Sequence, residues 1–100
     1  MHIISFSRLR KFWEKHPAAE RPLRAWHTHV EHVSWRNFAE VRNDFASADQ
    51  VKRLTVFNIA GNHYRLVVRI EYRIQMVYIR SIMTHTEYDT ETWKDDEWFE

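Results

Sequence analysis

The spacing of apolar residues along the chain changes near residue 51. Before that point, apolar residues recur every three or four positions, which is the spacing of an amphipathic helix. After it, apolar and polar residues alternate, which is typical of a strand with one buried face. This order predicts an α+β fold in which an N-terminal strand and two to three helices pack on an antiparallel β-meander.

The first half of the chain is predicted to contain one short strand and the helices. Residues 2–5 are β-prone, and residues 7–16 carry an apolar stripe at helical spacing that ends at a proline. A second stripe runs from about residue 18 to residue 33, and a short third helix follows with Asn37 as its cap. Residues 46–50 are mostly small and polar, so they are predicted to form a loop.

Two turns divide the second half of the chain into three predicted strands. Gly61 and Asn62 predict a two-residue type II′ turn, because glycine adopts a positive φ without steric cost. A second tight turn is predicted near Arg73 and Ile74. Pairing the strands outward from these turns brings apolar residues together on one face, and a shift of one residue would separate them. The predicted pairs on this face are Ile59–Tyr64, Phe57–Leu66, Thr55–Val68, Ile70–Val77, Val68–Ile79, Leu66–Ser81 and Tyr64–Met83.

The opposite face of the predicted sheet is rich in arginine. The same register brings Arg65, Arg69 and Arg80 together, with Tyr78 among them and Lys52 at the margin. Like charges at this spacing repel, so the arrangement predicts an anion or a carboxylate that compensates them. A planar guanidinium also suits bidentate phosphate contacts better than an ammonium group does. The pairs that place these side chains are Val67–Arg80, Arg65–Ile82 and Arg69–Tyr78.

The charge distribution leaves two alternative roles of the arginines open. The last 14 residues hold seven acids and one lysine, so residues 1–86 carry 14 of the 15 Lys and Arg against 7 of the 14 Asp and Glu, a formal +7. The arginines could point into solvent, or the acidic tail could fold back and pair with them. Apolar residues share this face and indicate a partly covered groove or a docking surface: Leu54, Val56, Val67, Met76 and Ile82.

Composition excludes several classes of protein and site. One hundred residues predict a single domain over residues 1–100, and zero cysteines exclude disulfides and cysteine-ligated metal sites. The lack of a long apolar run predicts neither a membrane span nor a signal peptide, which fits a cytoplasmic protein. His27, His29 and His32 do not share one helical face, so we expect no metal site and no cofactor.

Three titratable side chains stand near the arginines in the predicted sheet. His63 lies beside the first turn with the parity of Arg65, His85 ends the third strand, and Tyr88 follows three residues later. RNA cleavage without a metal needs a base for the ribose 2′-OH, cations for the phosphorane, and an acid for the leaving 5′-oxygen. His85 and Tyr88 are candidates for the acid–base roles. Lys52 and His63 are reserves for those roles, and the rings of Tyr78 and Tyr88 are alternatives for stacking on an unpaired base.

Two stretches of this sequence resemble HigB-type toxins of the RelE-like superfamily of bacterial toxin–antitoxin systems. They are "VFNIAGNHYRLVV" and "YIRSIMTHTEYD", in which the hairpin, the strand arginines and the strand-end histidine follow the family motif. The resemblance implies a small RelE-like fold and a ribosome-dependent mRNA endonuclease that uses the 2′-OH as nucleophile. It also implies a cognate antitoxin, usually of the helix-turn-helix type.

The resemblance assigns catalytic positions to Arg65, Arg80, His85 and Tyr88. Lys52, Arg69, Tyr78 and His63 remain predicted RNA- or phosphate-binding residues. The acidic, tryptophan-containing tail at about 90–100 follows no family pattern. Two alternatives to the enzyme stay open: a non-catalytic RNA- or protein-binding module, and a structural component whose sheet face docks a partner. A catalytic site requires His85 or Tyr88 to lie close to the arginines.

Overall fold

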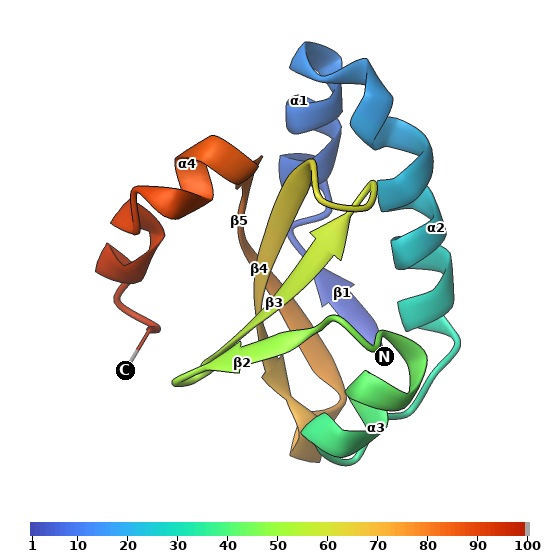
Figure 1. The fold of residues 1–100 in the computed structure, drawn as a ribbon. Helices are drawn as coiled ribbons and strands as arrows, with labels where there is room; N and C mark the ends of the chain where they lie inside the picture. The colour runs from blue at the N-terminus through green and yellow to red at the C-terminus, as the bar shows by residue number, and fades with distance from the viewer. Residues whose placement is uncertain (100) are drawn as a thin grey trace.

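The computed structural model describes residues 1–99, and its sheet lies between two layers (Figure 1). Two helices, α1 and α2, cover one face, while α4 and the C-terminal segment lie on the other side. The helices are α1 (Ser7–Lys15), α2 (Glu20–Glu31), α3 (Phe38–Asp44) and α4 (His85–Asp89), with short 3₁₀ turns η1 (Pro17–Ala19), η2 (Tyr72–Ile74) and η3 (Thr92–Asp95). The strands are β1 (His2–Ile4), β2 (Asp49–Val51), β3 (Leu54–Ile59), β4 (Tyr64–Glu71) and β5 (Met76–Thr84).

The five strands are ordered β1-β5-β4-β3-β2, which confirms the α+β prediction. The sheet is mixed, because β1 pairs in parallel with β5 while the other pairs are antiparallel. Residues 46–50 were predicted to be a loop, yet Asp49 and Gln50 pair with β3. A left-handed residue, Lys52 at φ 56°, turns the chain between β2 and β3 and divides the strand predicted to begin at residue 51.

The helices predicted in the first half of the chain are confirmed. The apolar stripes of α1 and α2 pack on one face of the sheet, where Leu9, Leu23 and Leu66 are fully buried. Asn37 caps α3, because its side-chain oxygen accepts a hydrogen bond of 3.1 Å from the backbone amide of Glu40. This core fixes the helix-side face of β4 and β5, so their alternate residues must point to the other side.

The first hairpin has the predicted register but a different turn. All five observed pairs between β3 and β4 follow the prediction, from Thr55–Val68 to Ile59–Tyr64. The turn takes four residues, 60–63, rather than two, and both Ala60 and Gly61 have positive φ values of 54° and 66°. Gly61 has the predicted positive φ, and the amide of His63 donates a bond of 3.3 Å to the Ala60 oxygen around Gly61 and Asn62, but the left-handed Ala60 before them was not predicted.

A β-bulge at Arg80 changes the register between β4 and β5. The pairs Ile70–Val77, Arg69–Tyr78 and Val68–Ile79 follow the prediction, but Val67 pairs with Ser81 rather than Arg80. Arg80 is thus the extra residue of a bulge, and every pair beyond it is shifted by one. The predicted pairs Leu66–Ser81, Tyr64–Met83 and Arg65–Ile82 are replaced by Leu66–Ile82, Tyr64–Thr84 and Arg65–Met83. As a result, Ile82 packs toward the helices and Met83 toward the opposite face.

The arginine-rich face is covered by the end of the chain rather than open. Leu54, Val56, Val67 and Met83 form a second core cluster on this side, and Trp93 from η3 packs into it. Trp93 is 7% exposed, so its indole closes much of the surface that was predicted to be a groove. Glu100, the last residue of the predicted tail, lies outside the described residues.

Candidate functional site

Arg65 is buried and joins the first hairpin turn to the start of α4. Its side chain projects from β4 and the residue is only 7% exposed. One guanidinium nitrogen, Nη2, bonds to the side-chain oxygen of Asn62 and, at 2.9 Å, to Nδ1 of His85. The other, Nη1, donates to the backbone oxygens of Asn62 and Tyr64 at 3.2 and 3.1 Å. Arg65 thereby fixes the imidazole of His85 against the end of the sheet.

His85 is the first residue of α4 and carries a defined tautomer. A guanidinium can only donate, so the bond from Arg65 requires an unprotonated Nδ1 and places the ring proton on Nε2. That nitrogen lies 3.2 Å from the carboxylate of Asp89, one helical turn further along. A capping box between Thr84 and Glu87 begins the helix, and so positions the pair. Arg65, His85 and Asp89 therefore form a continuous hydrogen-bonded chain.

A pocket of about 480 Å³ adjoins this chain at the end of β4 and β5. His63 lines it from the hairpin turn, and its backbone oxygen accepts a bond of 3.0 Å from the amide of His85. His16, from the end of α1, also lines the pocket, although no sequence pattern indicated its place here. Polar groups from the turn, from α1 and from α4 thus surround a cavity beside Arg65.

Tyr88 also lies beside Arg65 and packs against the second core cluster. The Arg65 guanidinium carbon is 5.6 Å from the centre of the Tyr88 ring, and the Trp93 ring stacks on Tyr88 at 5.0 Å. Burial raises the pKa of the Tyr88 hydroxyl above its ordinary value, and the carboxylate of Asp49 raises it further. The hydroxyl is therefore protonated at neutral pH and suits a proton donor better than a base.

Arg80 pairs with the acidic tail. Its Nε and Nη2 donate to the two carboxylate oxygens of Asp96 at 2.9 and 3.0 Å, and the side chains are 19% and 15% exposed. The Trp98 indole lies over the guanidinium with its centre 3.9 Å away. Burial alone would raise the pKa of Asp96, but hydrogen bonds from Arg80 and from the Trp98 amide hold that pKa below its ordinary value. Folding of the tail onto Arg80, left open by the sequence, is what the structure shows.

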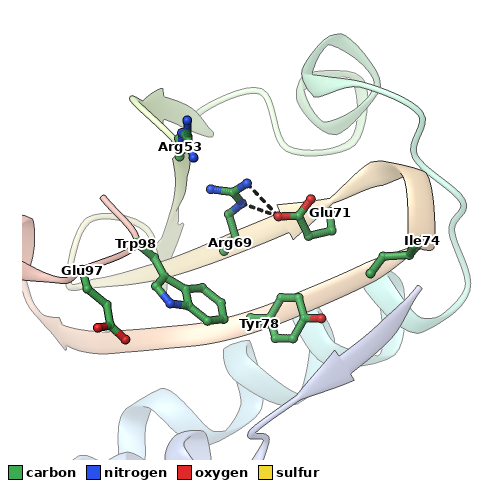
Figure 2. A pocket seen from close by; sticks show the side chains of 7 residues that line it. All are labelled: Arg53, Arg69, Glu71, Ile74, Tyr78, Glu97 and Trp98. Atoms are coloured by element: carbon green, nitrogen blue, oxygen red, sulfur yellow. Dashed lines mark hydrogen bonds and ion pairs between the residues drawn. The ribbon is translucent and has the colours of Figure 1, made fainter. Parts of the chain in front are cut away.

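Arg69 and Tyr78 line a separate pocket of about 430 Å³ (Figure 2). The Arg69 guanidinium turns toward Glu71, with Nη2 2.7 Å from the carboxylate, and the Trp98 indole meets the Tyr78 ring edge to face at 5.2 Å. Lys52 is exposed at the β2–β3 turn, with Nζ 5.9 Å from the centre of the Phe99 ring.

The arginines do not form the single patch that the sequence predicted. Arg65 bonds to His85, Arg69 to Glu71 and Arg80 to Asp96, so each guanidinium has its own partner. The reason is the bulge, which moves Arg80 out of the position across from Val67, together with the fold of the tail.

Residues 1–99 contain no group of three or more His, Asp or Glu side chains placed to hold a metal ion. None of the helices described here could cross a membrane.

Comparison with known proteins gives a consistent result. A family described as the RelE-like toxic component of a toxin–antitoxin system, HigB toxin, matches residues 19–91. The chain belongs to the HigB toxin family. It is 34% identical over 92 residues to the mRNA interferase toxin HigB of Escherichia coli K12, covering 89% of this chain and 88% of that protein. An mRNA interferase HigB from Escherichia coli O6:H1 is 25% identical over 92 residues, with 89% of each chain covered. The resemblance inferred from the sequence motifs is thus confirmed.

Some residues of the site lie within the segment that matches the HigB family, and others lie outside that segment. Arg65, Arg80, His85 and Tyr88 lie within residues 19–91, together with Asn62 and Asp89. Asp96 and Trp98 lie beyond the match, as does Arg8, which donates a bond of 2.7 Å to the backbone oxygen of the bulged Arg80.

Sequence reasoning did not single out four of these residues: Asn62, Asp89, Asp96 and Arg8. The four-residue spacing of His85 and Asp89 on one helix was a usable signal for Asp89. No local pattern indicates Arg8, because its contact with Arg80 spans 72 positions.

Proposed function

We propose that this HigB-family chain is an mRNA interferase, a metal-independent endoribonuclease that cuts mRNA on the ribosome and so stops translation. The relatives named mRNA interferase support the substrate class. The observation that carries the proposal is the contact of Arg65 with both His85 and Tyr88, which places two proton-transfer groups beside one cation. We further infer that it acts in the cytoplasm and is neutralised by a cognate antitoxin of the helix-turn-helix type.

The proposed cleavage is attack of the ribose 2′-oxygen on the adjacent phosphorus. When Nη2 of Arg65 turns from His85 to the substrate phosphate, Nδ1 of His85 becomes free to accept the 2′-OH proton. Asp89 then stabilises the imidazolium through Nε2. Tyr88 gives its proton to the 5′-oxygen as the phosphorus–oxygen bond breaks, which leaves a 2′,3′-cyclic phosphate and a 5′-hydroxyl. Arg80 supplies the second positive charge for the phosphorane, and Arg69 and Tyr78 contact the flanking RNA.

Expression of the chain in a bacterium that lacks the antitoxin tests this function. Growth should stop after induction, and mapping of transcript ends should reveal new 5′-hydroxyl ends in translated mRNA. A parallel culture with a translation initiation inhibitor separates cleavage on the ribosome from cleavage of free RNA. Normal growth and intact transcripts, from folded protein at the same level, would favour the non-catalytic RNA- or protein-binding module instead.

Removing the hydroxyl of Tyr88 tests its role as the proton donor. The variant Tyr88→Phe keeps the ring that stacks on Trp93, so the melting temperature should hardly change. Cleavage should fall by about 10²-fold or more, the usual contribution of one acid–base group. The matched control is Tyr78→Phe, which loses the same atom on the same side of the sheet but keeps its proposed stacking role. Equal activity of both variants would assign the leaving-group proton to another residue.

A further inference from the structure

The C-terminal segment contacts three residues that are proposed to bind RNA: Arg80, Tyr78 and Lys52. Asp96 bonds to Arg80, Trp98 lies on Arg80 and against Tyr78, and Phe99 lies near Lys52. These three tail residues lie outside the part of the chain that matches the HigB family. The tail therefore lies outside the segment matched to the family and covers the surface proposed to meet the substrate.

The contacts at Arg80 have the chemistry of an RNA contact. A carboxylate held by two parallel N–H bonds presents oxygens much as a phosphate does, and Arg8 adds a second positive charge close to Asp96. The Trp98 indole has its centre 3.9 Å from the Arg80 guanidinium carbon, and it meets the Tyr78 ring edge to face (Figure 2). It thus stands where a nucleobase would stack. One acid and one ring thus take the places of one phosphate and one base.

The tail has an anchored part and a part that can leave. Trp93 is buried in the second core cluster, stacks on Tyr88 and donates its indole N–H to the Tyr88 backbone oxygen at 3.2 Å. Beyond it, the polar contacts to the body of the protein are the Asp96–Arg80 pair and one bond of 3.2 Å from the amide of Arg53 to the oxygen of Phe99. Trp98 and Phe99 also pack at the edge of that cluster, and the Phe99 ring meets Trp93 edge to face at 5.8 Å, so release of residues 96–99 breaks these apolar contacts as well but leaves Trp93 stacked on Tyr88.

We propose that residues 96–99 are an intramolecular lid, which keeps the Arg80 phosphate site closed until an RNA strand displaces it. The lid rests on the proposed RNA-cleaving function, because it assigns Arg80 to the phosphate of the substrate. The apparent affinity for RNA is the intrinsic affinity multiplied by the fraction of molecules in which the lid is open, so a lid that is mostly closed weakens binding. RNA at a high enough local concentration opens the lid, because the RNA competes with residues 96–99 for the Arg80 guanidinium and for the aromatic surface beside it.

A pair of matched variants tests the lid. Asp96→Asn removes the charge on Arg80 but keeps an oxygen that can accept the bond from the Trp98 amide. Asp95→Asn removes the same charge from the adjacent exposed residue, for which residues 1–99 provide no side-chain partner. The probe is a single-stranded RNA that carries 2′-O-methyl groups throughout and cannot be cut, and its binding is followed by fluorescence anisotropy.

The lid predicts that Asp96→Asn binds this RNA about tenfold more tightly than Asp95→Asn does, since one charge-assisted contact holds the closed state. Any effect of net charge alone is the same in both variants. Equal affinities would overturn the proposal. Weaker binding by Asp96→Asn would also overturn it, because Asp96 would then be a residue that positions Arg80 for RNA.

Hydrogen exchange of the unmodified protein provides a second test that needs no variant. The amide of Arg53 is protected by its bond to Phe99, so displacement of the lid should speed its exchange when the uncleavable RNA binds. Continued protection of this amide in the complex would contradict the lid. Neither measurement depends on cleavage. A protein that does not cut RNA but opens its lid can therefore be distinguished from a protein that cuts RNA while its tail stays fixed.

Discussion

Replacing Arg80 by alanine is expected to abolish toxicity and also to destabilise the protein. The loss of one cation at the phosphorane should lower the cleavage rate by about 10²–10³-fold. From the sequence alone, Arg80→Ala is expected to leave the melting temperature nearly unchanged. In the structure, Arg80→Ala leaves the carboxylate of Asp96 without its partner at 15% exposure, which should cost about 1–3 kcal/mol of unfolding free energy.

The double variant Arg80→Ala with Asp96→Asn separates these two effects. If the instability arises from the unpaired carboxylate, neutralising Asp96 should restore most of the unfolding free energy, while cleavage stays lost. Chemical denaturation gives the stability of the four proteins in the cycle, and transcript mapping gives the activity. Recovery of cleavage in the double variant would show that Arg80 serves only to hold the tail.

Most of the fold follows from periodicities that the sequence displays directly. The apolar stripes of α1 and α2 and the alternation along β3 and β4 assign the residues to faces, so the elements and the register of the first hairpin could be predicted. The bulge could not, because Ile82 and Met83 are adjacent apolar residues and fit either parity. A shift by one residue simply exchanges which of the two faces the helices.

The candidate site was predictable where it depends on local spacing. The hairpin turn, Arg65 and the strand-end His85 lie close together because the turn and the strand pairing connect them. Contacts made by the tail depend on a long-range docking that has no period. Its excess of acids showed that Arg80 had possible partners, but nothing in the sequence distinguishes Asp96 from Asp95. Predicted roles for Lys52, Arg69, Tyr78 and His63 remain predictions.

Replacing Arg65 by methionine is expected to have the second large effect, on stability and activity together. Methionine fills a similar volume but leaves the oxygens of Asn62 and Tyr64 and Nδ1 of His85 without their buried donor. We expect a loss of about 2–3 kcal/mol of unfolding free energy. The matched control is Arg69→Met on the same strand, where the arginine pairs with the half-exposed Glu71 and the loss should stay below about 1 kcal/mol.

The tautomer of His85 shows whether Arg65 acts on catalysis through this imidazole. In the unmodified protein the Arg65 bond keeps the proton on Nε2, so nitrogen NMR should detect one neutral tautomer. In Arg65→Met only the Asp89 carboxylate still favours the proton on Nε2, so the share of the other tautomer should rise. In Arg65→Lys the charge returns without the forked geometry, so activity should recover only in part. An unchanged tautomer and full stability in Arg65→Met would mean that the buried guanidinium neither positions His85 nor supports the fold. The loss of cleavage would then come from the positive charge of Arg65 alone.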